Sequence, residues 1–322
     1  MTYDALYRLT QAVTGGDSTY AKWGLAMTYD RYGNRTAQSI ASTTPPSCVS
    51  PMVCPTNSVT VSTTTNQITG SGYSYDASGN MTQDGMNTLT YDAENRTVSA
   101  SGPLGSGSYV YDGNGLRVEK TVSGATTIYI FSGSKVIAEY ASGASPSSPT
   151  KEYIYSGGAL LATVTSSSTT YHHSDHLSVR MSTDTNGNDL ADQGHFPYGE
   201  TWYMGSGGTK WQFTTYERDA ESGNDYAQAR YNVNRLGRFS SPDPIPGSIA
   251  DPQSLNRYSY VRNMPVMAID PTGMCPDVAT SPPRRRRKQG GGHLQEVFRS
   301  GRGTRAAASS PLSRRDRHDG RR

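Results

Sequence analysis

The chain has 322 residues, a length that fits one large domain or two ordinary ones. Only 34% of the residues are hydrophobic, and the chain contains 34 glycines and 22 tyrosines but 5 phenylalanines. This composition favours half-buried pleated surfaces joined by tight turns over a bundle of packed helices. No segment is long and apolar enough to form a membrane-spanning helix. We therefore expect an all-β protein.

Charge is unevenly distributed along the chain. The net charge is +3, but residues 275–322 hold 13 basic and 4 acidic residues, a net charge of +9, which leaves about −6 for the rest. The mildly acidic body has no basic stripe with interleaved aromatic residues. Contact with nucleic acid is therefore expected only through the basic tail, if at all.

A short unit recurs through the first third of the chain. Each copy begins with Tyr-Asp, and the fuller copies continue to Gly and Asn, as in the segment YDASGNM at 75–81. Asp favours the first turn position because its carboxylate accepts bonds from backbone N–H groups ahead of it, and Gly or Asn tolerates positive φ. We interpret each unit as a hairpin corner. The copies begin at Tyr3-Asp4, Tyr29-Asp30, Tyr75-Asp76, Tyr91-Asp92 and Tyr111-Asp112.

Strands are expected on both sides of these corners. Segments 126–131 (TTIYIF), 135–140 (KVIAEY) and 151–155 (KEYIY) alternate β-branched or aromatic residues with polar ones, which is typical of strands. One hairpin cannot bury its own apolar face, so the units must stack. Residues of about 40–70 form a Ser/Thr-rich insert, which we expect to be a loop or an edge strand.

Two cysteines of this insert, Cys48 and Cys54, lie close together, whereas Cys275 stands alone. Their spacing is not that of a zinc knuckle, and the chain has no second cysteine pair. A local disulfide in an oxidising compartment is therefore favoured over a metal site.

A concentration of His and Asp follows in the segment YHHSDHLSVR at 171–180. Imidazole and carboxylate groups suit zinc. Adjacent side chains of an extended segment point to opposite faces, however, so only two or three of these groups can converge. We favour no metal and no other cofactor. The candidate ligands are His172, His173, Asp175 and His176.

The densest run of Tyr, Arg, Asp and Gly is the segment 210–274. It contains two separated acidic positions, Asp219 and Asp243, and it ends in the sequence DPTGM at 270–274. From residue 275 the composition changes altogether.

These motifs resemble those of one known family. The repeated Tyr-Asp-x-x-Gly-Asn/Arg units are similar to the YD (RHS) repeats of bacterial RHS proteins, of toxin-complex C subunits and of teneurins. The segment YERDAESGNDYAQARYNVNRLGRFSSPDP, followed by NRYSYVRNMPVMAIDPTG, resembles the RHS repeat-associated core, whose pattern is ERDxETGLDYxxARYYDPxLGRFxSPDP…NxYxYxxNNPxxxxDPxG. The resemblance covers residues 1–274 and implies repeats over 1–165, a core domain over 166–274 and a basic, disordered tail over 275–322.

The resemblance implies both a fold and an activity. The hairpins would form part of a spiral β-sheet shell that the core domain plugs. The core would be an aspartic autoprotease that cuts the chain after DPxGL/M, here at Met274-Cys275, and thereby releases an enclosed C-terminal toxin. The implied catalytic pair is Asp219 and Asp243, with Arg218 as a supporting or purely structural partner. The cleavage site would be presented by Asp270, Pro271 and Gly273.

Such a pair has a chemical basis. Two neighbouring carboxylates cannot both ionise easily, so they share a proton and titrate as a unit. The ionised member can then activate water while the protonated member polarises the scissile carbonyl. The chain departs from the family pattern at Asn232 and Val233, which lie between Asp219 and Asp243 in the sequence, so the activity of the site stays open.

Residues 275–322 occupy the place of the toxin, but they contain too few apolar residues for a core. The expected partners are upstream repeats of a longer chain, this C-terminal segment as substrate, and an immunity or secretion-system protein. We expect a secreted or cell-surface protein whose targeting region is not in this chain. Two alternatives stay open: a non-enzymatic surface module that binds glycans or a partner, and a degraded, non-functional copy.

Overall fold

The structure is a computed structural model that describes residues 1–16, 20, 22–41 and 54–274, all within one compact unit, Met1–Ser281. This described part consists of β-strands and short 3-10 turns and contains no α-helix. The predicted all-β fold is thereby confirmed. None of the described residues belongs to a helix that could cross a membrane. The predicted tail, 275–322, lies outside the described residues.

The first strands form two small antiparallel sheets. A five-stranded sheet contains β1 to β5 in sequence order, and β6 pairs with β7. The bounds are β1 (Thr2–Tyr3), β2 (Leu9–Thr14), β3 (Trp23–Tyr29), β4 (Arg35–Ile40), β5 (Asn57–Ser58), β6 (Thr60–Val61) and β7 (Ile68–Thr69). The strands β5 to β7 belong to the Ser/Thr-rich insert. Within it, Cys54 is buried and disulfide-bonded, while Cys48 lies outside the described residues.

The largest sheet has 14 strands, β8 to β21, and every strand in it pairs antiparallel with its neighbours in the sequence. This sheet continues past residue 165 through four more strands, β18 to β21. The bounds are β8 (Tyr73–Tyr75), β9 (Met81–Asp84), β10 (Thr88–Tyr91), β11 (Thr97–Gly102), β12 (Gly105–Tyr111), β13 (Arg117–Val122), β14 (Ala125–Ser132), β15 (Lys135–Ala141), β16 (Lys151–Ser156), β17 (Ala159–Val164), β18 (Thr169–Ser174), β19 (Val179–Thr183), β20 (Asp189–His195) and β21 (Thr201–Met204).

The Tyr-Asp units are the corners of these hairpins, as predicted. At the β12–β13 corner, Asp112 Oδ1 accepts the backbone N–H groups of Asn114 and Leu116, each at 2.9 Å. The hydroxyl of Tyr111 donates to the backbone carbonyl of Thr97 at 2.7 Å, in the preceding hairpin. The sheet register shifts by one residue between Val110 and Tyr111. The aspartate therefore closes its own turn, while Tyr111 joins this hairpin to the previous one.

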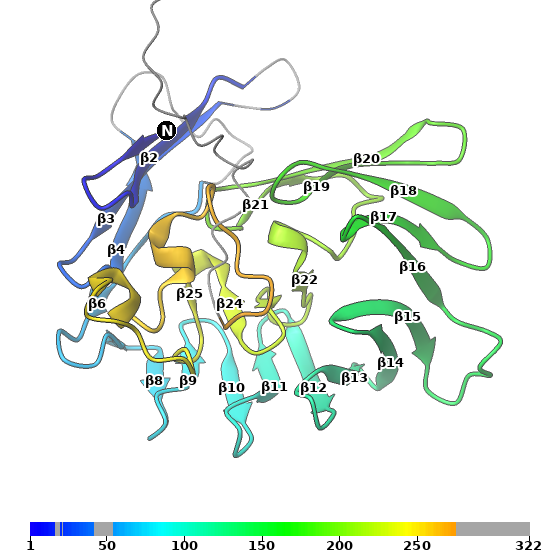
Figure 1. Cartoon of the computed structure of the whole chain (residues 1–322), viewed down its shortest axis with the longest axis horizontal. Helices are drawn as coiled ribbons and strands as arrows, with labels where there is room; N and C mark the ends of the chain where they lie inside the picture. Colours follow the sequence, from blue (N-terminus) through cyan, green and yellow to red (C-terminus); the bar gives the residue numbers. More distant parts are fainter. Residues whose placement is uncertain (17–19, 21, 42–53, 275–322) are drawn as a thin grey trace, which may run out of the picture. The chain divides into compact units, whose positions relative to one another are not determined.

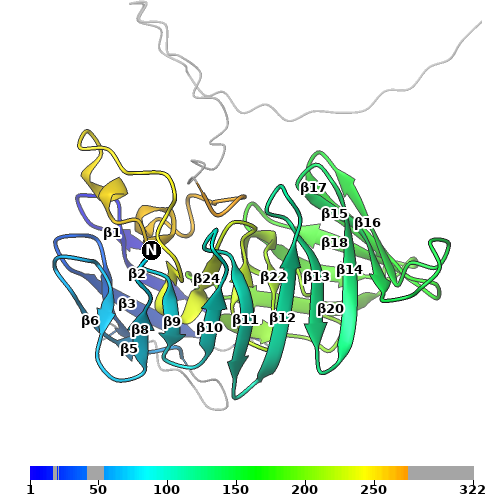
Figure 2. The same ribbon diagram turned by 90° about the horizontal axis from the view of Figure 1, so that it is seen from below.

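The segment 210–274 packs against the inner face of the 14-stranded sheet. Figures 1 and 2 show the strands following one another around this segment, which is drawn in yellow and orange. Its last sheet has the order β22-β23-β24-β25. The bounds are η1 (Phe213–Thr215), β22 (Glu217–Arg218), β23 (Asp225–Tyr226), β24 (Tyr231–Val233), η2 (Asn234–Leu236), β25 (Arg238–Phe239), η3 (Pro252–Leu255) and η4 (Tyr260–Asn263).

Buried apolar side chains join the segment 210–274 to both large sheets. Tyr226 and Tyr231 pack with Leu89 and Tyr109 of the 14-stranded sheet. The five-stranded sheet contributes Trp23 and other residues to a core shared with the segment. Because the apolar faces of the hairpins are covered in this way, the segment acts as the core on which the repeats fold.

Candidate active site

Asp219 follows β22 and is completely buried. Its carboxylate accepts from Arg117 Nη1 at 2.6 Å and from Arg117 Nη2 at 3.1 Å. Lys120 Nζ lies 2.6 Å from Asp219 Oδ1. Both cations come from β13 of the repeats, so Asp219 joins the segment 210–274 to the sheet.

The surroundings of Asp219 form a closed network of buried charges, which we call the Arg117 cluster: Arg117, Lys120, Lys210, Glu139, Glu217, Asp219 and Glu221. Burial alone would raise the pKa of Asp219, but Arg117 and Lys120 outweigh it and hold the pKa below its usual value. Lys210, Arg117 and Lys120 likewise outweigh burial at Glu217 and lower its pKa. The paired cations therefore favour the ionised forms of Asp219 and Glu217.

Asp243 lies elsewhere. It follows β25, whereas Asp219 follows β22, and these two strands are the opposite edges of the four-stranded sheet. Neighbouring strands are about 4.8 Å apart, so two intervening strands separate the carboxylates by more than a hydrogen bond can span. The structure thus does not bring the predicted pair together.

Asp243 instead shares an arginine with Asp270. Arg230 Nη2 lies 2.9 Å from Asp243 Oδ2 and 3.3 Å from Asp270 Oδ2. The side chains of Arg230 and Asp270 are 3% and 1% exposed, and that of Asp243 is 16% exposed. Burial lowers the pKa of Arg230, and the two carboxylates oppose this shift. We call these three residues the Arg230 cluster.

The Arg230 cluster holds the end of the described chain. Arg230 Nε donates to the backbone carbonyl of Gly273, and Asp270 Oδ1 accepts from the backbone N–H of Met274 at 3.1 Å. Gly273 has a φ of 68°, and a Cβ at this position would collide with the carbonyl oxygen of Ala227. The turn at 270–274 therefore requires glycine, and it places the predicted cleavage site next to two carboxylates.

Pro271 lies in the same turn. The neighbouring carbonyl of Thr272 accepts from the backbone N–H of Ala229 at 3.1 Å, and the hydroxyl of Tyr216 donates to the carbonyl of Asp270. The turn is thus held by two earlier residues of the same segment, Tyr216 and Ala229. Cys275, the other half of the predicted scissile bond, lies outside the described residues.

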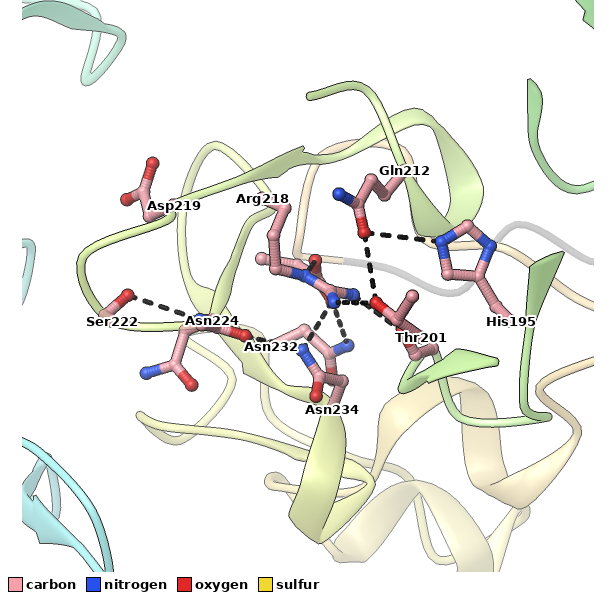
Figure 3. Close-up of polar contacts among 12 residues, drawn as sticks. His195, Thr201, Gln212, Arg218, Asp219, Ser222, Asn224, Asn232 and Asn234 are labelled. Atoms are coloured by element: carbon pink, nitrogen blue, oxygen red, sulfur yellow. Dashed lines mark hydrogen bonds and ion pairs between the residues drawn. The ribbon is translucent and has the colours of Figure 1, made fainter. Parts of the chain in front are cut away.

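Arg218 is bound to Asp225 and not to Asp219. Its Nε donates to Asp225 Oδ1 at 2.5 Å, and its Nη2 donates to the carbonyl of Gly199 at 2.6 Å. Figure 3 shows the guanidinium among Thr201 and the asparagines of this region, with the carboxylate of Asp219 pointing away from it. Arg218 therefore ties β22 to the β20–β21 turn.

The two departures from the family pattern lie in the core. Asn232 is completely buried and donates from Nδ2 to Asp225 Oδ2 at 3.3 Å. Val233 packs with Ile68, Met81 and Leu236. Neither residue belongs to the Arg230 cluster.

The histidine segment does not converge on one point. His172 is buried and contacts Thr163 at 2.8 Å through Nε2, whereas His173 is exposed. Asp175 is paired with Arg180 at 2.7 Å, and His176 contacts the carbonyl of Val266. Within the described ranges, no three His, Cys, Asp or Glu side chains are grouped as metal ligands.

Arg230 was not among the residues singled out from the sequence. A signal for the cluster does exist, because Asp243 and Asp270 both belong to Asp-Pro dipeptides within one segment. That signal is weak by itself, since Asp251 is also followed by proline and lies instead against Arg262, at 2.9 Å.

No protein-family model matches the chain. It is 33% identical over 257 residues to a tRNA3(Ser)-specific nuclease WapA of Bacillus spizizenii and 31% identical over 257 residues to a tRNA nuclease WapA of Bacillus subtilis. Each match covers 76% of this chain and 11% of the relative. The chain thus spans about a tenth of the length of these curated relatives.

Solved structures share the fold. A TcdB2-TccC3 structure superimposes with a TM-score of 0.64 at 21% identity, over 85% of this chain and 16% of that one. The Photorhabdus luminescens Tc holotoxin pore gives a TM-score of 0.65 at 21% identity, over 87% and 15% of the two chains. Together with the Tyr-Asp corners and the segment 210–274, these matches show that the chain belongs to the RHS/YD-repeat proteins.

Proposed function

We propose that the chain cuts its own backbone between Met274 and Cys275, with Asp243 and Asp270 as the acid–base pair. One observation carries the proposal. A single nitrogen of Arg230 lies within ion-pair distance of both carboxylates, and the same guanidinium and Asp270 bind the backbone of Gly273 and Met274. The two acids thus lie beside the residues that precede the bond to be cut.

The chemistry follows from this placement. One ionised carboxylate takes a proton from water, whose oxygen attacks the carbonyl carbon of Met274. The protonated partner donates to the carbonyl oxygen, and the resulting intermediate collapses as the C–N bond breaks and the nitrogen of Cys275 gains a proton. Both carboxylates contact the same nitrogen of Arg230, which holds them close to each other. Arg230 positions both acids and fixes the Gly273 carbonyl.

The cut would free the C-terminal segment of a larger RHS shell. The shell-like fold of the solved TcdB2-TccC3 structures supports this role, as does the similarity to relatives named as toxic nucleases. We propose that the segment after Met274 is the released part in toxin delivery or bacterial competition. A secreted or cell-surface location is supported by the disulfide-bonded state of Cys54, because disulfides persist in oxidising compartments.

Intact-mass measurement of the purified chain tests the cleavage. We expect two products separated at Met274-Cys275, and we expect Asp243→Asn and Asp270→Asn each to leave the chain whole. Asp251→Asn is the matched control, because Asp251 also precedes a proline in this segment but pairs with Arg262 outside the Arg230 cluster. That variant should be cut like the parent.

A folded, soluble parent chain that stays uncut would overturn the proposal and favour a non-enzymatic binding module. Equal cleavage in Asp270→Asn and in the parent would remove Asp270 from the mechanism. Circular dichroism of each variant checks that the fold persists, so that loss of cleavage is not mistaken for unfolding.

A further inference from the structure

A cavity of about 300 Å³ lies where three parts of the fold meet, and none of its lining residues belongs to the Arg117 or the Arg230 cluster. It is lined from the five-stranded sheet, from the end of β20 and the turn after it, and from η1, which contribute Tyr3, Trp23, His195, Phe196 and Phe213. The rings of Trp23 and Phe196 meet edge to face, with their centroids 5.0 Å apart. The walls are therefore largely aromatic, and such walls favour an apolar ring.

Two polar atoms of this lining have no hydrogen-bond partner within the described part of the chain. They are Trp23 Nε1 and His195 Nδ1. Both residues are buried, since Trp23 is 5% exposed and His195 is 9% exposed. A buried donor or acceptor that stays unpaired is costly. The cavity therefore favours a ligand that pairs with both atoms.

The protonation of His195 determines what its Nδ1 can do. Its Nε2 lies 3.4 Å from Gln212 Oε1, as Figure 3 shows, and an amide oxygen can only accept, so Nε2 carries the proton. Burial lowers the pKa of His195 to about 3, so the ring is neutral at physiological pH. Nδ1 is then an acceptor, whereas Trp23 Nε1 is a donor. The cavity thus offers one donor and one acceptor.

This pair of atoms selects against ions. A carboxylate accepts from the indole but cannot donate to Nδ1, and an ammonium group donates but cannot accept. Arg180 also lines the cavity, but it is paired with Asp175 at 2.7 Å, so its charge is already balanced. A single hydroxyl group can both donate and accept. Further hydroxyl groups on the ligand would find no other unpaired buried atom in this lining.

We propose that this cavity, which we call the Trp23 cavity, binds a small neutral ring that carries one hydroxyl group, as a phenol does. The hydroxyl accepts from Trp23 Nε1 and donates to His195 Nδ1, while the ring packs against Phe196 and Phe213. The site goes beyond the proposed self-cleavage and does not depend on it.

Calorimetric titration of the full chain tests the proposal, with phenol and toluene as probes. The two molecules have nearly the same shape, so toluene reports on the fit of the ring, and phenol reports on the hydroxyl bonds as well. Trp23→Phe keeps an aromatic ring but removes the indole N–H. We expect it to weaken phenol binding about tenfold and toluene binding by no more than about twofold. His195→Phe should have the same selective effect.

Trp211→Phe is the matched control, because Trp211 lines a different aromatic cavity. It should leave the affinity for phenol unchanged. Absence of phenol binding to the parent chain would overturn the proposal. So would equal weakening of phenol and toluene by Trp23→Phe, or a loss of phenol binding in Trp211→Phe alone.

The choice of ligand class is tested by three further probes. Benzoate and benzylamine carry a charge on a similar ring, and each should bind at least about tenfold more weakly than phenol. Methyl glucoside, a ring with several hydroxyl groups, should also bind more weakly than phenol. Benzoate or benzylamine at the affinity of phenol would overturn the selection of neutral ligands, and tighter binding of the glucoside would overturn the assignment of a single hydroxyl.

Discussion

Two buried arginines face pairs of acids in this molecule, and they differ in what surrounds them. Arg117 lies with Asp219 and Glu217 in a network completed by Lys120 and Lys210. Arg230 lies with Asp243 and Asp270, binds the backbone of the turn at 270–274, and lines a cavity that Met274 also lines. Burial and charge are thus similar in the two clusters. They differ in that only the Arg230 cluster, of these two, binds the backbone of the turn at 270–274.

The largest expected effect concerns the Arg230 cluster. Arg230→Lys keeps the positive charge but loses the forked geometry that reaches Asp243, Asp270 and the Gly273 carbonyl together. We expect self-cleavage to slow by about 100-fold, measured as the fraction of cut chain over time. Arg218→Lys, which changes the arginine bound to Asp225, is the control. Equal slowing in both variants would contradict a local role for Arg230.

The second effect concerns the Arg117 cluster and is one of stability. Arg117→Met leaves Asp219 and Glu217 buried with fewer positive charges, and removing one partner of a buried ion pair costs about 3–5 kcal/mol. Urea unfolding followed by tryptophan fluorescence measures the change. Arg180→Met, at a pair with a 34% exposed arginine, should cost at most about 1 kcal/mol. Similar losses in both variants would argue against the Arg117 cluster as a structural joint.

The hairpin corners were predictable from sequence because their bonds are local. Asp112 binds residues two and four positions ahead, so the Tyr-Asp pattern contains nearly all of the information. The position of Asp219 relative to Asp243 was not predictable in this way. It depends on the order of four two- or three-residue strands, β22 to β25, which no periodicity of the sequence specifies.

The contacts of Arg230 were not predictable from the sequence either. Its partners lie 13 and 40 positions away, and such separations are set by packing on the sheet. The resemblance to the RHS core indicated the segment 210–274, and the Arg230 cluster lies in that segment. Only the structure showed that the acid beside Asp243 is Asp270, a residue expected to present the cleavage site.

The third effect concerns the pH dependence of stability, to which buried His195 and the Arg117 cluster contribute over different pH ranges. Burial lowers the pKa of His195 to about 3 in the folded chain. In the unfolded chain the imidazole has its ordinary pKa of about 6.5, so below that pH the unfolded state binds a proton that the folded state does not. Stability should therefore fall as the pH decreases from about 6.5, by about 3 kcal/mol at pH 4 from this residue. Thermal midpoints of the parent and of His195→Gln across this range measure it.

The Arg117 cluster should respond only at lower pH. The pKa values of Asp219 and Glu217 lie below their usual range, so their contribution is present above the unfolded values near 4 and is lost as the pH falls further. A His195→Gln chain whose midpoint still falls as steeply between pH 6.5 and 4.5 would show that other groups control this transition.

The smallest effect concerns a single repeat. Tyr111→Phe removes the hydroxyl bond to the Thr97 carbonyl and should cost about 1 kcal/mol in urea unfolding. Tyr7→Phe, at a residue that is 70% exposed, should leave the midpoint unchanged. A neutral Tyr111→Phe would mean that the tyrosine ring alone, through its packing, joins successive hairpins.

The Tyr-Asp corner has a consequence for how such chains can change in length. Each unit closes its own turn with its aspartate, and the hydroxyls of Tyr29, Tyr91 and Tyr111 donate to a backbone carbonyl in the hairpin before. Inserting or deleting a whole hairpin therefore leaves the bonding rule of every other hairpin intact. A gene that gains or loses one repeat unit therefore lengthens or shortens the sheet by one hairpin and leaves the hydrogen bonds between the other hairpins unchanged. The segment 210–274, by contrast, must keep its particular contacts.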